Sequence, residues 1–124
     1  HFLLRQVKTR GITEFISKLS NSYTKYYNIK YNRVGPLFQG EFKAVLIETN
    51  PQLMWTSAYI HMNPVKSKIS SKPGEYAWSS YKDIMGEREI PLVHKEFLIE
   101  IFGNKEKFIK ETLIYDVSKG VFDS

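Results

Sequence analysis

The dipeptide Asn50-Pro51 fixes the start of a helix more firmly than any other local signal in the chain. Asn is a favoured N-cap residue, and proline at the first helical position lacks an N–H that would have no partner there anyway. Pro64 pushes the residue before it, Asn63, away from helical geometry, so we expect the helix to end there. The sequence therefore predicts a helix of about three and a half turns over residues 50–63.

Other segments also show the periodicity of amphipathic helices. From residue 11 on, apolar residues recur at the i, i+3, i+4, i+7 spacing of a helix of about four turns. They are Ile12, Phe15, Ile16, Leu19, Tyr23 and Tyr26. Helical spacing returns after Pro91 and stops at Gly103, and a last helix is predicted over residues 105–115.

Two short segments have the composition of β-strands. Residues 1–8 begin with an apolar run that gives way to polar residues, as at the end of a strand, and residues 42–49 have an apolar, partly β-branched centre. Residues 28–40 and 70–81 contain turn-forming residues and are predicted to be connections. We therefore expect an α+β fold, with part of a small antiparallel sheet, packed helices and a C-terminal helical extension.

The positive charge is concentrated in the first third of the chain. Residues 1–47 carry eight basic and two acidic side chains, a balance of +6, whereas the whole chain has a net charge of +5. Aromatic residues lie among these bases, and such interleaving suits a phosphate backbone whose bases can stack. Composition alone leaves two interpretations open, which are nucleic-acid binding and a solvated basic face over an aromatic core.

The sequence argues against several classes of protein. It contains no cysteine, which excludes disulfide frameworks, cysteine-based zinc sites and thiol nucleophiles, so any nucleophile must be oxygen or nitrogen. No uninterrupted apolar run approaches the roughly 18 residues of a membrane span. The chain begins at His1, without a methionine and without the pattern of a signal peptide, and we interpret it as a fragment of a longer protein.

One face of the predicted helix carries residues with catalytic chemistry. Tyr59 and Asn63 are four residues apart, so a hydroxyl and an amide project from one side of the helix about one turn apart. A tyrosine that attacks phosphorus must lose its proton, and the phosphate charge must be neutralised, which a divalent metal can do. The competing interpretation is a half-buried tyrosine whose hydroxyl only meets water.

Three stretches form a combined pattern. They are residues 33–44 (Arg-Val-Gly-Pro-Leu-Phe-Gln-Gly-Glu-Phe-Lys-Ala), 59–66 (Tyr-Ile-His-Met-Asn-Pro-Val-Lys) and 76–81 (Tyr-Ala-Trp-Ser-Ser-Tyr). Together they resemble the REP-associated tyrosine transposases, a bacterial branch of the HUH single-strand DNA transposases. The resemblance covers roughly residues 1–86 and implies a ferredoxin-like catalytic core, here without its opening strand and its first metal histidine. Residues 87–124 match the family loosely and are interpreted as the helical extension.

The resemblance implies roles for individual residues. Tyr59 matches the nucleophile that forms a 5′-phosphotyrosine link, and Asn63 matches a polar residue that completes or orients the metal site. His1 matches the second histidine of the metal motif, so His1 and Asn63 would be ligands of Mg²⁺ or Mn²⁺. His61 lies inside the motif and is either a DNA contact or structural. The side chains expected to hold the DNA backbone are Lys18, Lys25, Lys30 and Arg33.

The function implied by the resemblance is transfer of a single DNA strand beside a hairpin, in the bacterial cytoplasm with the nucleoid. No nucleotide cofactor is required, because the phosphotyrosine bond keeps its energy for rejoining. Whether the fragment is itself an active enzyme stays open, and so does its oligomeric state. Two alternatives remain. One is a nucleic-acid-binding module without cleavage activity, from a truncated or decayed transposase, and the other is a basic globular domain that binds another protein.

Overall fold

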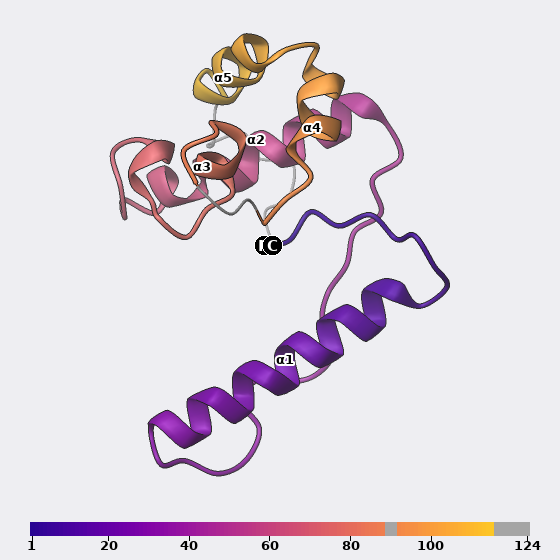
Figure 1. Cartoon of the computed structure of the whole chain (residues 1–124), viewed down its shortest axis with the longest axis vertical. Helices are drawn as coiled ribbons and strands as arrows, with labels where there is room; N and C mark the ends of the chain where they lie inside the picture. Colours follow the sequence, from indigo (N-terminus) through magenta and orange to yellow (C-terminus); the bar gives the residue numbers. More distant parts are fainter. Residues whose placement is uncertain (89–91, 116–124) are drawn as a thin grey trace. The chain divides into compact units, whose positions relative to one another are not determined.

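The structure of the chain is a computed structural model that describes residues 1–88 and 92–115. It divides into two compact units, one of residues 2–46 and one that joins His1 to the chain from Ile47 onward. Figure 1 shows the first unit in indigo and purple and the helices of the second from magenta to yellow. The predicted boundary at residue 86 rests on the family resemblance, which this division does not test.

The unit of residues 2–46 is built on one long helix, α1 (Gly11–Lys30), which confirms the amphipathic period of the sequence (Figure 1). Glu14 in its first turn and Lys30 in its last turn both interact favourably with the helix dipole. No residue of α1 is buried within the described part of the chain. The Phe2 ring lies edge-on against the ring of Phe15 at a centroid distance of 6.0 Å, so local contacts support the start of the helix.

The other unit begins with α2 (Asn50–Lys66), the helix that Asn50-Pro51 predicts. Its N-cap is Thr49, whose Oγ1 accepts a hydrogen bond from the backbone N–H of Gln52 at 3.2 Å. The predicted Asn50 cap is therefore wrong by one residue. The proline rule tolerates this shift, because the second helical position also has no intrahelical partner for its N–H.

Pro64 lies inside α2 and not at its end, which corrects the predicted end of the helix at Asn63. Proline removes one hydrogen bond from a helix, but the Ser67 N–H donates to the Asn63 carbonyl at 2.9 Å and the turn continues. Pro64 is buried, so its packing offsets the lost bond. As a consequence Asn63 and Lys66 are both helical, one and two turns after Tyr59.

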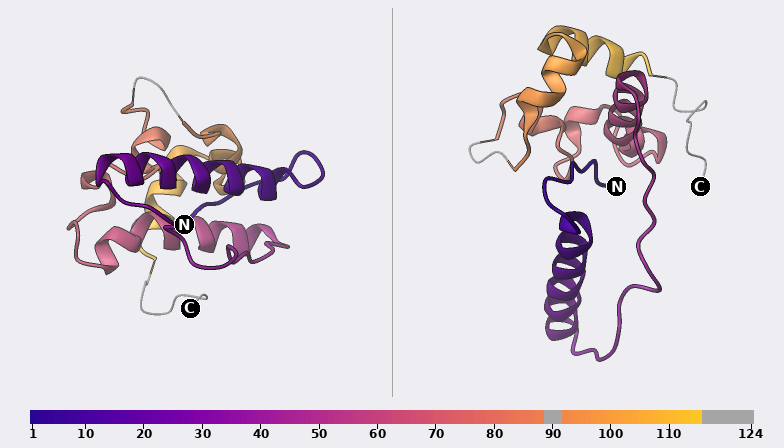
Figure 2. Two further views of the ribbon diagram at one scale, coloured as in Figure 1. Left: turned by 90° about the horizontal axis from the view of Figure 1, so that it is seen from below. Right: turned by 90° about the vertical axis from the view of Figure 1, so that its right-hand side faces the viewer.

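Short helices pack around α2 in this unit. They are η1 (Pro73–Glu75, a 3₁₀ helix), α3 (Tyr81–Ile84), α4 (Lys95–Phe102) and α5 (Lys105–Leu113). Both α4 and α5 contact α2, and Figure 2 shows from two further sides how they gather against it. Their side chains form the core, which consists of Tyr81, Ile84, Leu98, Phe102 and Phe108.

The two helices predicted towards the C-terminus are confirmed as α4 and α5. Gly103 separates them with a φ of 105°, a conformation that glycine adopts without strain. Residues 89–91 and 116–124 of the predicted extension lie outside the described residues. None of the described helices is long and apolar enough to cross a lipid bilayer.

The expected α+β fold with an antiparallel sheet is wrong, because residues 1–88 and 92–115 contain helices and no strand. Residues 1–7 and 42–48, within the predicted strands, have no regular secondary structure. A strand needs the backbone groups of a neighbouring strand, and two isolated strands are only marginally stable in water. Val45 and Leu46 are accordingly 63% and 77% exposed, although their composition favours a strand.

Candidate functional site

Tyr59 and Asn63 lie on a flank of α2 that faces away from the helical core. The buried residues of α2 are Ser57, Ala58, His61, Met62 and Pro64. Tyr59 and Asn63 are only partly buried and project about one helical turn apart from the neighbouring side of the helix. The fold therefore holds the Tyr59 side chain on a packed helix and leaves part of it open to solvent.

The ring of His1 lies edge-on against the ring of Tyr59. The two centroids are 5.4 Å apart and the planes are inclined by 70°. Both residues belong to the same compact unit, although they are far apart in the sequence. The structure thus brings together the two side chains that the resemblance implies as metal ligand and nucleophile.

Lys66 contributes a positive charge to the same flank of α2. Its Nζ lies 5.7 Å from the centroid of the Tyr59 ring, within the range of a cation–π interaction. An ammonium group there stabilises negative charge next to the phenol, either on the oxygen itself or on an anion bound beside it. The sequence motifs do not single out Lys66, although its spacing of seven residues from Tyr59 places it on the same stripe of a helix.

The described residues do not by themselves fit a divalent metal. Among residues 1–88 and 92–115, no group of three or more His, Cys, Asp or Glu side chains could hold an ion. His1 and Asn63 offer one imidazole and one amide, whereas Mg²⁺ takes six oxygen ligands in an octahedron. His1 and Asn63 could therefore hold only part of the coordination shell of a metal at Tyr59, and further ligands would have to complete it.

His61 is buried in the core, with 3% of its surface exposed. Its Nε2 lies 2.7 Å from the Ser80 hydroxyl, and its Nδ1 lies 3.4 Å from the hydroxyl of Ser57. Its ring packs edge-on against Tyr81 and Phe108. Burial lowers the pKa of His61 to about 4, because the imidazolium would lose its hydration. This position favours the structural role of His61 over contact with DNA.

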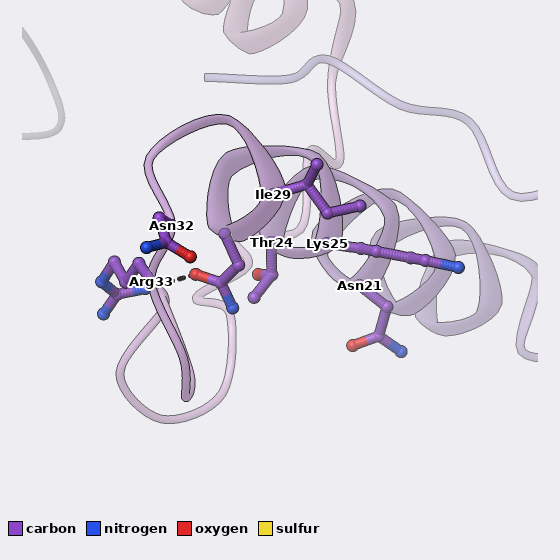
Figure 3. A pocket seen from close by; sticks show the side chains of 7 residues that line it. Asn21, Thr24, Lys25, Ile29, Asn32 and Arg33 are labelled. Atoms are coloured by element: carbon purple, nitrogen blue, oxygen red, sulfur yellow. Dashed lines mark hydrogen bonds between the residues drawn. The ribbon is translucent and has the colours of Figure 1, made fainter.

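The four basic residues expected to hold DNA all lie in the unit of residues 2–46. Lys25 and Arg33 line a shallow groove of about 690 Å³ beside the C-terminal half of α1, which Figure 3 shows from close by. Lys30 lies over the rings of Tyr26 and Tyr31, at 5.8 and 5.4 Å from their centroids. Lys18 is exposed on α1. The basic side chains therefore occupy two different surroundings, one polar and one aromatic.

Comparisons of the chain with protein-family models, with curated proteins and with solved structures find no match. The case for a function therefore stands on the side chains around Tyr59, on the basic surface of residues 2–46 and on the motifs that resemble a family. Of these, the contact between His1 and Tyr59 is independent of the motif that contains Tyr59, since His1 lies outside that motif.

Proposed function

We propose that the chain carries the nucleophile of a DNA strand transferase, with Tyr59 attacking a phosphodiester of single-stranded DNA. The observation that supports this best is the edge-on contact of His1 with Tyr59 at 5.4 Å. The resemblance implies that these two positions cooperate in catalysis, and no property of a generic helical domain requires an imidazole beside this phenol.

In the proposed reaction the phenol oxygen of Tyr59 loses its proton and attacks phosphorus. A bond forms between this oxygen and phosphorus, the bond from phosphorus to the 3′ oxygen breaks, and that oxygen takes up a proton and leaves as a 3′-OH. The ammonium of Lys66 offsets negative charge close to the Tyr59 ring. A bound Mg²⁺ or Mn²⁺ would neutralise charge on the phosphate, with His1 and Asn63 among its ligands.

The substrate in this proposal is single-stranded DNA beside a hairpin. The +6 balance of residues 1–47 supplies the field that attracts it, and Lys18, Lys25, Lys30 and Arg33 hold its backbone. No nucleotide cofactor takes part. The proposed location is the bacterial cytoplasm, in association with the nucleoid.

A second candidate function is nucleic-acid binding without cleavage. The observation that favours it is the small set of metal ligands, since His1 and Asn63 alone do not fit Mg²⁺. The basic surface of residues 2–46 would bind DNA in the same way in either case.

Formation of a covalent adduct distinguishes the two candidates. The chain is incubated with labelled single-stranded hairpin DNA and Mg²⁺ or Mn²⁺, denatured, and separated on a gel. A transferase leaves labelled DNA attached to the protein, and Tyr59→Phe removes this band while DNA binding persists. Binding without an adduct would support the second candidate, and an adduct that survives Tyr59→Phe would place the nucleophile elsewhere.

A further inference from the structure

One stripe of α1 carries only lysine and asparagine side chains, and it continues into the turn that follows. The residues are Lys18, Asn21, Lys25, Asn28 and Asn32. The first four alternate at spacings of three and four residues, so they follow one line along the helix surface. Asn32 follows the end of the helix and lines the same groove as Asn21, Lys25 and Asn28. We call this set the polar stripe. The apolar residues of α1, which include Phe15, Leu19 and Tyr23, lie on the opposite side of the helix.

The C-terminal part of the polar stripe lines the groove of Figure 3. The residues around it are Asn21, Thr24, Lys25, Asn28, Ile29, Asn32 and Arg33. Asn32 follows the end of α1 and has a φ of 50°, a left-handed conformation that asparagine tolerates better than most residues. This conformation keeps its side chain on the groove after the helix has ended.

Hydrogen bonds hold the turn after α1 in place through Asn28. Its Nδ2 donates to the Gly35 carbonyl at 3.0 Å, and its Oδ1 accepts from Arg33 Nη1 at 2.9 Å. Arg33 Nη2 donates to the Pro36 carbonyl, also at 2.9 Å. Both ends of the Asn28 amide are therefore used inside the protein, and the groove is formed before any ligand binds.

The amides of Asn21 and Asn32 have no such use. Within the described part of the chain, neither side chain makes a hydrogen bond. An asparagine amide presents a donor beside an acceptor, which matches the N6 amino group and the N7 atom of adenine in the major groove. Lys18 and Lys25 stand in the same line and suit the phosphates on either side.

The negative charge nearest to the polar stripe is already paired. Glu14 lies one turn before Lys18, and its carboxylate is 2.8 Å from the Nζ of Lys8. The stripe therefore keeps a positive character along its length, in a unit whose charge is itself strongly positive. This positive charge favours a polyanionic partner over a neutral or basic one.

We propose that α1 lays its polar stripe in the major groove of duplex DNA, with Asn21 and Asn32 contacting adenine edges and Lys18 and Lys25 contacting phosphates. The major groove, about 12 Å wide, admits an α-helix. This inference rests on the proposed function, because it assigns the duplex stem of the hairpin substrate to a named surface of the chain.

The test is fluorescence anisotropy with two labelled DNA hairpins of identical sequence and an adenine–thymine stem. In one of them the stem adenines are replaced by 7-deazaadenine, which keeps Watson–Crick pairing and lacks the N7 acceptor. The wild-type chain should bind the adenine hairpin about tenfold more tightly than the 7-deaza hairpin. The double variant Asn21→Ala, Asn32→Gly should bind both equally, and glycine at position 32 keeps the positive φ.

Lys25→Ala is the matched control on the same stripe. It should weaken binding to both hairpins alike and keep their ratio, because a phosphate contact carries no base preference. Circular dichroism at 222 nm should show an unchanged helix in every variant. Equal affinity of the wild-type chain for the two hairpins, or a preference that survives in the double variant, would overturn the inference. Either result leaves the Tyr59 adduct as a separate question, whereas failure to bind any hairpin would overturn both.

Discussion

His61 Nε2 and Ser80 Oγ lie 2.7 Å apart and join the middle of α2 to the residue before α3. The imidazole is enclosed by the rings of Tyr81 and Phe108, at centroid distances of 5.9 and 5.5 Å. Because α2 also carries Tyr59 on its outer flank, this buried contact fixes the orientation of the helix that presents the candidate nucleophile.

The buried state of His61 predicts that stability falls in mild acid. The pKa of His61 is about 4 in the folded chain, whereas an ordinary histidine has a pKa of 6.5, so the unfolded chain takes up a proton that the folded chain does not. The contribution is complete above pH 6.5 and is lost as the pH falls from 6.5 to 4, by about 3 kcal/mol in total. Urea unfolding between pH 5 and pH 7 measures this slope.

The matched variant for this prediction is His61→Gln, which keeps a polar side chain in the core and cannot titrate. Its free energy of unfolding should be lower than that of the wild-type chain at pH 7 but nearly flat between pH 5 and pH 7. The same slope in both proteins would show that another group controls the acid response.

The N-cap of α2 predicts a difference between two adjacent residues. Thr49 Oγ1 accepts the Gln52 N–H, so Thr49→Ala should lower the free energy of unfolding by about 1 kcal/mol. Asn50→Ala should change it by no more than about 0.5 kcal/mol, because Asn50 is already helical. Equilibrium unfolding in urea measures both changes. A larger loss of stability in Asn50→Ala than in Thr49→Ala would show that Asn50 is the N-cap, as the sequence predicts.

Elements that are decided by local signals could be predicted from the sequence. The apolar period of α1, the proline near the start of α2 and Gly103 between α4 and α5 each act through their immediate neighbours, and these helices are present. The strands could not be decided in this way. A run such as Val45-Leu46-Ile47 favours an extended backbone, but only a second strand provides its hydrogen bonds.

The candidate site shows the same division between local and distant signals. The common face of Tyr59 and Asn63 follows from helical spacing alone. The contact of His1 with Tyr59 depends on chain packing, and before the structure only the family resemblance pointed to it. The burial of His61 could not be predicted from the sequence either, because its partners Ser80 and Phe108 come from segments much later in the chain.

The basic surface predicts a steep dependence of DNA binding on salt. If Lys18, Lys25, Lys30 and Arg33 each neutralise one phosphate of the hairpin DNA, the logarithm of the binding constant should fall with the logarithm of salt concentration, with a slope between about −3 and −4. A gel-shift titration with single-stranded hairpin DNA at several salt concentrations measures this slope. Binding that is absent at low salt would contradict the nucleic-acid interpretation and favour a protein partner.

The charge of Lys66 predicts a graded effect on the reaction of Tyr59. Lys66→Ala removes the ammonium that lies 5.7 Å from the Tyr59 ring and should slow adduct formation roughly fivefold, the effect of about 1 kcal/mol. Lys66→Arg keeps the charge and should retain most of the rate. Single-turnover kinetics of the adduct compare the variants. If Lys66→Ala forms the adduct as fast as the wild-type chain, Lys66 acts in DNA binding or stabilises the end of α2 and has no part in the reaction of Tyr59.

Asn63 predicts a change in metal dependence without a loss of the nucleophile. Asn63 lies one turn beyond Tyr59 on the same helix, α2, so Asn63→Ala removes an amide while leaving the phenol in place. A weak or orienting ligand is partly replaced by water, and we therefore expect residual adduct formation that requires more Mg²⁺ or Mn²⁺. Titration of the metal against the amount of adduct gives the concentration for half-maximal reaction. That concentration should rise about tenfold or more in Asn63→Ala and stay unchanged in Asn50→Ala, a control on the same helix. If Asn63→Ala instead lowers the plateau and leaves the metal concentration unchanged, the amide acts on DNA or on the Tyr59 hydroxyl and is not part of a metal site.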